Sequence, residues 1–360
     1  MSFTRQTKST WRFECMVKGK RFSKTYKSYE ETKSEVQKKF LEWKIQCEKN
    51  MCVVQTYTFK EFAGIWINEY CKDYSPLVVQ RYKTNLKNWI IPMLGGYKLT
   101  EITPFVLDKF IAELKDSTTK YETRENKQLS NGTIQKLYAI VRTIITTAFQ
   151  KDLVANNPCL KVKLNLKKKL DEEVHYYDMT TYKKFLNLIE KELDDKARVI
   201  EFAVKTGLRR SEIFGLTWAD IDFEKAELSV NKTLQKVSGK MCVMPCKTKA
   251  SIRKISLPIS MVSLLKEYRK KHMGNFYIFS NVDYDSVTQW FRKWQVTKGL
   301  PRIKFHDLRH THATLLLYQG VDIKTISERL GHSGIGITMN TYTHVMKELD
   351  TKAAIAIDAI

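Results

Sequence analysis

A lysine-rich stretch near the middle of the chain, NNPCLKVKLNLKKK at residues 156–169, most constrains how this polypeptide can fold. The Asn-Asn-Pro triplet ends a preceding helix, because proline lacks a backbone N–H group and its ring blocks the previous turn. Five of the nine residues 161–169 are lysines, which favours an exposed segment. A chain of 360 residues is also long enough for more than one domain. We therefore predict a basic linker over residues 158–172, with separately folded units on either side.

The chain carries a large excess of positive charge, with 62 Lys and Arg against 39 Asp and Glu, or +23. Such an excess favours a polyanionic partner, either nucleic acid or an anionic membrane. No apolar run approaches the roughly 18 residues needed to span a bilayer, and the first ten residues lack the apolar core of a signal peptide. Seven scattered cysteines predict reduced thiols, with neither a disulfide framework nor a complete zinc site. We expect a cytoplasmic, DNA-associated protein that has no membrane partner.

Residues 1–52 are predicted to form a small basic domain. Apolar and polar residues alternate in WRFECMV (residues 11–17) and again in RFSKTYKS (residues 21–28), as in half-buried strands. A helix should follow from Tyr29 to Glu48, which gives a three-stranded sheet with one helix. Residues 1–28 hold eight Lys and Arg and one Glu. Such a face could lie in a DNA groove, or it could simply keep the domain soluble. The candidate DNA contacts are Lys18, Lys20, Arg21, Lys24 and Lys27.

Residues 57–157 have a helical pattern throughout. The TFKE sequence at residues 58–61 is a capping box, and Ser75-Pro76, Thr103-Pro104 and Ser130 mark three further helix starts. Four helices in such a length predict a compact bundle. The lysines that follow in the linker, including Lys161 and Lys163, could attract DNA phosphates or only solubilise the linker. Both interpretations remain open.

Residues 173–360 combine helices with a few short strands. Strands are predicted at residues 226–232, 240–245 and 252–257, and helices flank them on both sides. The expected fold class is therefore α+β and multidomain. It comprises a small N-terminal sheet with a helix, a four-helix bundle, and a mostly helical third domain with a small antiparallel sheet.

Separate stretches of this third domain carry side chains suited to handling a phosphate. Arg209 lies in TGLRRSE, and His306 and Arg309 lie three residues apart on one predicted helix face. Tyr342 stands in NTYTH, a polar setting that predicts a tyrosine outside the hydrophobic core. Two further candidates complete the set, Lys247 in a strand-turn-strand stretch and His332 in LGHS.

Breaking a phosphodiester requires groups of this kind. Arginine can hold two phosphate oxygens at once and stays charged at any working pH. Donors aimed at those oxygens gain strength as charge develops in the transition state. A tyrosine can attack phosphorus if its surroundings stabilise the phenolate, and a lysine can protonate the leaving oxygen.

Together these stretches resemble the tyrosine recombinase family of the phage integrase type. The matching motifs are T-G-L-R-x-S-E, the K-T-x-x-S hairpin lysine, H-x-x-R, L-G-H-S and the terminal T-x-x-x-Y-x-H. The resemblance implies that residues 1–52 bind arm-type DNA sites, that residues 57–157 bind core sites, and that residues 173–360 are catalytic. It also implies catalysis without a metal or other cofactor.

The resemblance further implies a role for each motif residue. Arg209 and Arg309 would hold the scissile phosphate, and His306 and His332 would assist by hydrogen bonding and proton transfer. Lys247 would protonate the 5′ oxygen. Tyr342 would attack and form a 3′-phosphotyrosyl bond, from which the strand is rejoined to integrate or excise mobile DNA.

Several alternatives stay open at the level of sequence. Arg210 or Lys249 could replace its near neighbour in the motif. His310 and His312 are interpreted as packing groups or as groups that support the site residues from behind. The apolar tail at residues 347–360 could contact a neighbouring subunit, as in a tetramer on DNA, or pack on its own domain. Proteins that assist excision or bend DNA are possible further partners.

Three other functions compete with recombination. A type IB topoisomerase uses the same chemistry to nick and reseal one strand. A non-catalytic DNA-binding regulator could retain the same fold. The histidines between residues 306 and 344 could instead belong to a metal-dependent nuclease, which would lose activity in EDTA.

Overall fold

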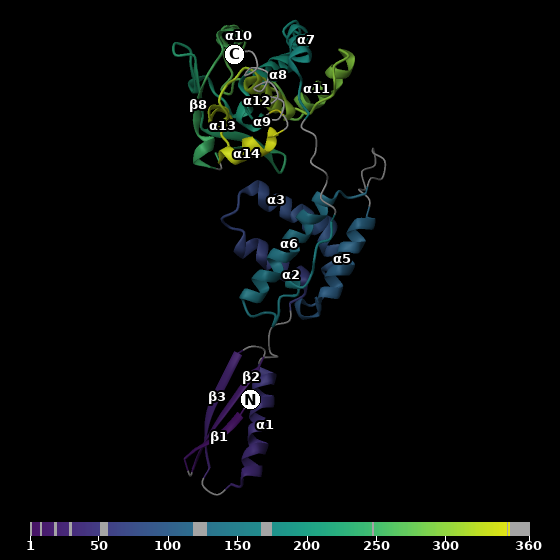
Figure 1. Ribbon diagram of the computed structural model, residues 1–360, viewed down its shortest axis with the longest axis vertical. Coiled ribbons are helices and arrows are strands. Elements are labelled where there is room, and N and C mark those ends of the chain that lie inside the picture. The colour runs from purple at the N-terminus through teal and green to yellow at the C-terminus, as the bar shows by residue number, and fades with distance from the viewer. Residues whose placement is uncertain are drawn as a thin grey trace, which may run out of the picture. The chain divides into compact units, whose positions relative to one another are not determined.

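The computed structural model shows two compact units, Met1–Leu170 and Asp171–Ile360 (Figure 1). The described residues are 2–7, 9–17, 20–28, 31–50, 57–117, 128–166, 175–246, 248–343 and 345. Small antiparallel sheets accompany a mostly helical chain, which confirms the predicted α+β class. Every helix within these residues is too short or too polar to cross a lipid bilayer.

The first unit begins with an antiparallel sheet in the order β1-β2-β3. Its strands are β1 (Ser2–Thr7), β2 (Thr10–Val17) and β3 (Lys20–Lys27), and helix α1 (Lys33–Asn50) follows them. Alternate residues of β2 are buried against α1, as the period-two pattern predicts. The shared core contains Trp11, Phe13, Cys15, Val17, Val36, Phe40 and Cys47.

The remainder of the first unit is a helical bundle with its own hydrophobic core. Its elements are α2 (Phe59–Ile65) with η1 (Trp66–Tyr70), α3 (Pro76–Asn85) with η2 (Leu86–Ile90) and α4 (Ile91–Leu94), η3 (Leu99–Glu101), α5 (Pro104–Asp116), α6 (Asn131–Gln150) and η4 (Pro158–Leu160). The predicted helix starts are confirmed, because Thr58, Thr103 and Ser130 each accept a backbone N–H bond at an N-cap.

The basic stretch after the bundle is not fully solvated over its described part. Val162, Leu164 and Leu166 pack against the bundle core, while the neighbouring Lys161 and Lys163 are exposed. The sequence predicts an exposed linker because five of the nine residues 161–169 are lysines. The structure instead uses the alternation of the apolar side chains to attach residues 158–166 to the bundle.

The second unit is mostly helical. Its helices are α7 (Met179–Ile189), α8 (Asp195–Thr206), α9 (Arg210–Gly215), η5 (Trp218–Asp220), η6 (Lys249–Ser251), α10 (Ile259–Lys271), α11 (Ser286–Thr297), α12 (Asp307–Tyr318), α13 (Ile323–Leu330) and α14 (Ile335–Thr341). One face of α12 joins the main core through Leu308. Its other face, with Ala313 and Leu317, joins a smaller cluster formed with α13 and the residues after α14.

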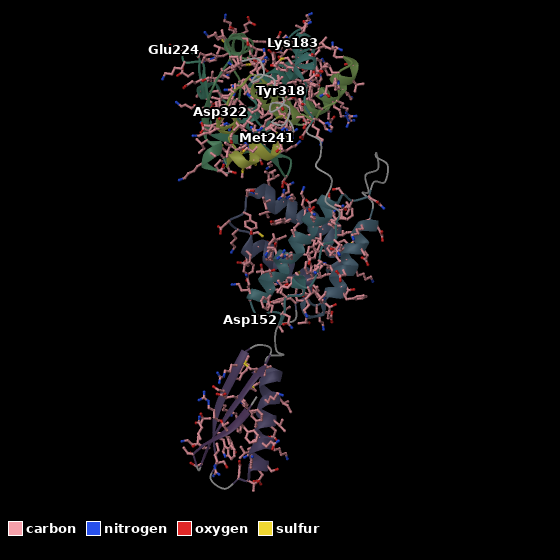
Figure 2. The ribbon with its side chains drawn as sticks, viewed as in Figure 1. Asp152, Lys183, Glu224, Met241, Tyr318 and Asp322 are labelled. Carbon is pink, nitrogen blue, oxygen red and sulfur yellow. The ribbon has the colours of Figure 1, made fainter. Side chains whose placement is uncertain are left out.

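The strands of the second unit form two small antiparallel sheets. One has the order β4-β5-β8, from β4 (Ile221–Asp222), β5 (Glu227–Val230) and β8 (Arg253–Ser256). The other is a hairpin of β6 (Lys232–Val237) and β7 (Lys240–Pro245), on which Met241 is exposed (Figure 2).

The prediction of one strand over residues 226–232 was therefore wrong. The run is divided at Asn231, whose side-chain amide donates to Asp220 Oδ1 at 3.0 Å. The residues on either side of Asn231 pair in different sheets.

Candidate active site

Arg209 is fixed by the tight junction between α8 and α9. Gly207 ends α8 with φ of +70°, and a Cβ atom there would lie 2.6 Å from the His312 ring, so the position requires glycine. Arg209 then occupies the N-cap position of α9. Glu212 accepts the Arg209 backbone N–H at 2.9 Å and its Nη1 at 2.8 Å. The Arg209 side chain is therefore oriented by its own helix start, although it remains 35% exposed.

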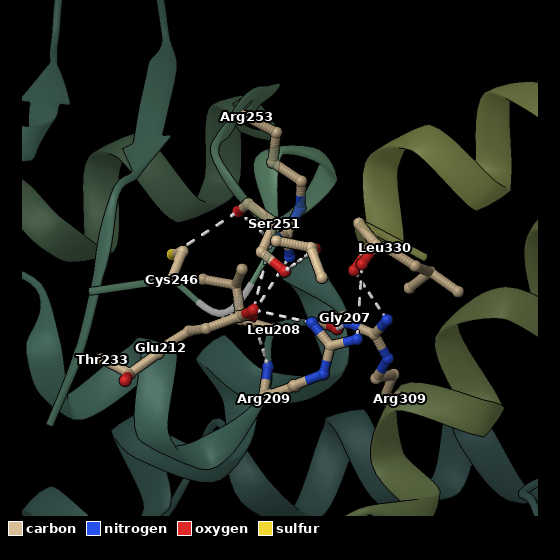
Figure 3. A network of polar contacts seen from close by, with 12 residues as sticks. Gly207, Leu208, Arg209, Glu212, Thr233, Cys246, Ser251, Arg253, Arg309 and Leu330 are labelled. Carbon is tan, nitrogen blue, oxygen red and sulfur yellow. Dashed lines mark hydrogen bonds and ion pairs between the residues drawn. The ribbon is translucent and has the colours of Figure 1, made fainter. Parts of the chain in front are cut away.

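Glu212 is a buried carboxylate between two arginines. Its oxygens accept hydrogen bonds from the Arg209 side chain at 2.8 Å and from the two Nη atoms of Arg253, on strand β8, at 3.1 and 3.2 Å (Figure 3). Burial raises the pKa of Glu212, but the hydrogen bonds and charges of the two guanidinium groups outweigh it, so the net shift is downward. Glu212 therefore stays ionised at neutral pH and holds both arginines.

Arg309 projects from α12 and is almost fully buried, at 3% exposure. It donates to the carbonyl oxygens of Gly207 at 2.9 Å and Leu330 at 2.6 Å. Desolvation and the nearby charge of Arg209 lower the pKa of Arg309 to about 9, so it remains charged at neutral pH. Because Arg209 donates to the next carbonyl, that of Gly331, at 3.4 Å, both guanidinium groups converge on the end of α13 (Figure 3).

His332 follows directly on this convergence point. Its Nδ1 hydrogen-bonds to Thr338 Oγ1 at 2.7 Å. Desolvation, with the charges of Arg309 and Arg209, lowers the pKa of His332 to about 4. His306 is exposed at the N-cap of α12, and desolvation of its ring and the Arg309 charge lower its pKa as well. Both rings are therefore neutral hydrogen-bonding groups near pH 7 in the free protein.

Tyr342 lies in the core, and the prediction that it lies outside was wrong. Its side chain is 1% exposed and packs in the cluster of Ala313, Leu317, Ile326, Leu330 and Val345. Its hydroxyl makes a 3.0 Å hydrogen bond with His310 Nδ1. This polar partner inside an apolar pocket explains how a phenol from a polar sequence can be buried. Burial raises the pKa of Tyr342, so the hydroxyl is protonated in this position.

The structure separates the two ambiguous arginines. Arg210 donates to Thr288 at 2.9 Å and lies 4.0 Å from the centre of the Tyr284 ring. Only Arg209 of the two contacts Glu212 among the described residues. Lys247 falls outside the described residues, and the alternative Lys249 lies exposed in η6.

The candidates in the first unit lie on exposed positions where they are described. Arg21, Lys24 and Lys27 are exposed on β3, and Arg21 pairs with Glu14 at 2.9 Å. Lys18 falls outside the described residues, as does the side chain of Lys20. The apolar tail at 347–360 also lies outside them.

Sequence reasoning missed Arg253 as a member of the site and left His310 as either a packing group or a group that supports the site residues; its contact with the Tyr342 hydroxyl fits the second. His312 is a packing group, since it is buried against Gly207 and hydrogen-bonds to Val204 O at 2.9 Å. His310 stands one helical turn after His306, which is the signal that could have placed it in the site. Arg253 lies two residues before the buried Ile255 on β8. Residues two apart on a strand share a face, so this spacing indicates that both side chains point inward.

No group of three or more His, Cys, Asp or Glu side chains that could hold a metal ion occurs within the described ranges. The arrangement instead presents two fixed guanidinium groups with adjoining imidazoles. Such a set is suited to binding an oxyanion and to stabilising charge that develops on it.

Comparison with known proteins identifies this architecture. Residues 177–348 match the phage integrase family model, and residues 58–115 match the N-terminal SAM-like domain of phage integrases. The tyrosine recombinase XerC of Pediococcus pentosaceus is 30% identical over 241 residues, covering 62% of this chain and 74% of that protein. A XerC-like tyrosine recombinase of Caldanaerobacter subterraneus subsp. tengcongensis is 28% identical over 360 residues, covering 90% and 89%.

Solved structures show the same fold. The Tn1549 transposon integrase in complex with a circular intermediate DNA superposes with a TM-score of 0.68 at 22% identity, covering 80% of this chain and 95% of that one. A lambda integrase tetramer bound to a Holliday junction gives a TM-score of 0.59 at 16% identity, covering 92% and 95%. The chain thus belongs to the phage integrase family of tyrosine recombinases, the site-specific recombinases of phages and other mobile elements.

Proposed function

We propose that this recombinase cleaves and rejoins DNA through a 3′-phosphotyrosyl intermediate on Tyr342, and that it thereby integrates and excises a mobile element. The observation that carries the proposal is the convergence of Arg209 and Arg309 on the Leu330–Gly331 carbonyls, directly before His332. This convergence gathers the candidate phosphate ligands from α9, α12 and the end of α13 at one place.

Arg209 and Arg309 bind the scissile phosphate. The cluster has a net positive charge, because it combines Arg209, Arg253 and Arg309 with the single carboxylate of Glu212. Arg309 makes the stronger anchor because its position is buried and fixed by two carbonyl oxygens. Arg209 is more exposed and can turn from Gly331 O toward a phosphate oxygen. Both contacts strengthen as negative charge grows in the five-coordinate transition state.

Attack requires Tyr342 to leave its buried position. In the free protein the hydroxyl is occupied by His310 and surrounded by apolar side chains. The seven-residue helix α14 that precedes Tyr342 follows Gly331 and Gly334, so a short segment can carry the tyrosine to the phosphate. There the Tyr342 hydroxyl passes its proton to one of the neutral imidazoles, His306 or His332. Its oxygen bonds to phosphorus as the bond to the 5′ oxygen breaks, and Lys247 supplies the proton to that 5′ oxygen.

The phosphotyrosyl ester retains the energy of the broken phosphodiester. A 5′ hydroxyl from another strand can therefore displace Tyr342 and restore a phosphodiester, with neither ATP nor a metal ion consumed. His306 and His332, both neutral in the free protein, serve as hydrogen-bond donors to the phosphate and as proton-transfer groups.

The DNA partner is bound by all parts of the chain. Residues 1–52 bind arm-type sites through the basic face of the sheet, residues 57–157 bind the core site, and residues 158–172 connect this domain to the catalytic residues 173–360. The lambda integrase tetramer on a Holliday junction supports a tetramer on DNA here too, with residues 347–360 as the subunit contact. Factors that bend DNA or promote excision join this assembly, which acts in the cytoplasm.

A strand-exchange assay tests this function. A supercoiled plasmid and a linear duplex, each with the attachment site of the element, are incubated with the protein in parallel reactions with and without EDTA. Recombinant products from wild type and none from Tyr342→Phe are expected. Relaxation of supercoils without recombinant products would identify a topoisomerase, DNA binding without any cleavage would identify a regulator, and loss of cleavage in EDTA would identify a metal-dependent nuclease.

A further inference from the structure

We infer that Arg253 is a positioning residue that holds three catalytic segments in register: the Arg209 turn, the turn after Lys247, and the approach to His332. This inference rests on the proposed function, because it explains how the phosphate site is kept in shape. Arg253 belongs to β8, outside the motifs that identify the family in this sequence.

The Arg253 guanidinium is 7% exposed and points toward Glu212 (Figure 3). Its Nη1 and Nη2 meet the two oxygens of Glu212 at 3.2 and 3.1 Å, a two-pronged contact that only arginine can make. Its Nε donates to the carbonyl oxygen of Arg329 at 2.6 Å. Its Nη1 also donates to the carbonyl oxygen of Ser251 at 3.1 Å.

Each contact leads to a different part of the catalytic site. Glu212 fixes Arg209, as described above. Ser251 closes the η6 turn that begins two residues after Lys247. Arg329 lies in the last turn of α13, immediately before Leu330 and Gly331, whose carbonyls receive the two phosphate-binding arginines. One side chain therefore connects elements that are distant in sequence.

Gly331 shows how closely Arg253 is fitted to the backbone. A Cβ atom at Gly331 would lie 2.8 Å from Arg253 Nη1 and 3.0 Å from the Ala250 carbonyl oxygen. The residue also has φ of +67°, which favours glycine independently. The guanidinium and the η6 turn are thus packed directly on the backbone that precedes His332.

The same contacts exclude a direct role in phosphate binding. Arg209 is 35% exposed, and Arg309 donates to neutral carbonyl oxygens that a charged phosphate can replace as acceptors. Both Nη atoms of Arg253 are instead paired with the buried carboxylate of Glu212. Loss of the two-pronged contact with Glu212 should therefore slow cleavage by displacing the catalytic groups, while the chain keeps its affinity for DNA.

The test compares Arg253→Lys with the wild type on two substrates. One is a suicide duplex with an ordinary phosphodiester at the cleavage site. The other carries a sulfur in place of the bridging 5′ oxygen, and its thiolate leaves without a general acid. The matched control is Lys254→Gln, because Lys254 is the next residue on β8 and its side chain is 70% exposed.

If Arg253 positions these segments, Arg253→Lys binds the duplex within about threefold of wild type and cleaves the ordinary substrate about 100-fold more slowly, as expected for a displaced catalytic group. Part of this loss is recovered on the sulfur substrate, because the contribution of the Lys247 turn is no longer needed. Lys254→Gln behaves as wild type. Cleavage by Arg253→Lys within about threefold of wild type, or an equal loss on both substrates, would overturn the inference.

Should Arg253→Lys fail to fold, Gly331→Ala provides the second variant, since its methyl group displaces the same guanidinium. The same partial recovery on the sulfur substrate is expected, and its absence counts against the inference. Tyr342→Phe is run in parallel. A covalent complex formed by Tyr342→Phe would refute the proposed function, whatever the Arg253 variant does.

Discussion

Replacing Glu212 by glutamine should destabilise the catalytic unit strongly, although the change preserves the shape of the side chain. Glu212 is 1% exposed and balances Arg253, which is 7% exposed, as well as the half-buried Arg209. Removing one partner of a buried ion pair costs about 3–5 kcal/mol, since the remaining charge is left uncompensated. The amide oxygen can still accept one N–H group, which places the expected loss near the lower value. A loss of about 3 kcal/mol corresponds to a Tm decrease of about 6–12 °C for a unit of this size.

Urea unfolding of the purified protein, followed by tryptophan fluorescence, measures this loss at pH 7. The matched control is Glu227→Gln, because the half-buried Glu227 pairs with the exposed Lys254 at 4.0 Å. Such a pair contributes about 0–1 kcal/mol. If Glu212→Gln lowered the free energy of unfolding no more than Glu227→Gln does, the Arg209–Glu212–Arg253 network would not be a major stabilising element.

The effect of pH follows from the direction of the Glu212 shift. The pKa of Glu212 is lower in the folded protein than in the unfolded chain, where it is about 4.3. Its ionised form therefore stabilises the fold above that value, and this contribution disappears as the pH falls through the lowered pKa. The difference in stability between wild type and Glu212→Gln should shrink from pH 7 toward pH 3. A constant difference would show that charge is not its cause.

Four other substitutions test separate parts of the site. Gly207→Ala should lower the free energy of unfolding by about 2–4 kcal/mol in urea titrations, because it combines a left-handed backbone with a methyl group 2.6 Å from the His312 ring. Arg209→Ala should slow cleavage of a suicide duplex about 100-fold or more, whereas Arg210→Ala should cleave it within about threefold of the wild-type rate. A larger loss with Arg210→Ala would show that Arg210, and not Arg209, binds the scissile phosphate. His310→Ala should raise the nitration rate of Tyr342 in the free protein about fivefold, which corresponds to a lost hydrogen bond of about 1 kcal/mol; an unchanged rate would mean that His310 does not retain the tyrosine.

Much of the fold could be predicted from local signals. The sequence around Thr58, Thr103 and Ser130 predicts helix starts, because capping depends on one side chain and the next few residues. The alternation of apolar and polar residues in 11–17 likewise predicts a strand with one buried face, because it depends only on neighbouring residues. The division at Asn231 could not be predicted, because it depends on Asp220 and on pairing with strands that are distant in sequence.

The site shows the same division between local and long-range information. Arg209, Arg309 and His332 could be proposed from short motifs and a family resemblance. The burial of Tyr342 could not, because its pocket is built by side chains from α12 and α13 and its hydroxyl needs His310. Arg253 was missed since its importance lies in contacts with α9 and α13, which no short motif records.

The central claim, that Tyr342 becomes covalently attached to DNA, is tested most directly by mapping the attachment. The protein is trapped on a nicked attachment-site duplex and digested with protease and nuclease, and the nucleotide-bearing peptide is sequenced by mass spectrometry. The account predicts one modified residue, Tyr342, carrying a 3′-phosphate nucleotide. A nucleotide on any other residue, or cleaved DNA with no attached peptide, would contradict it.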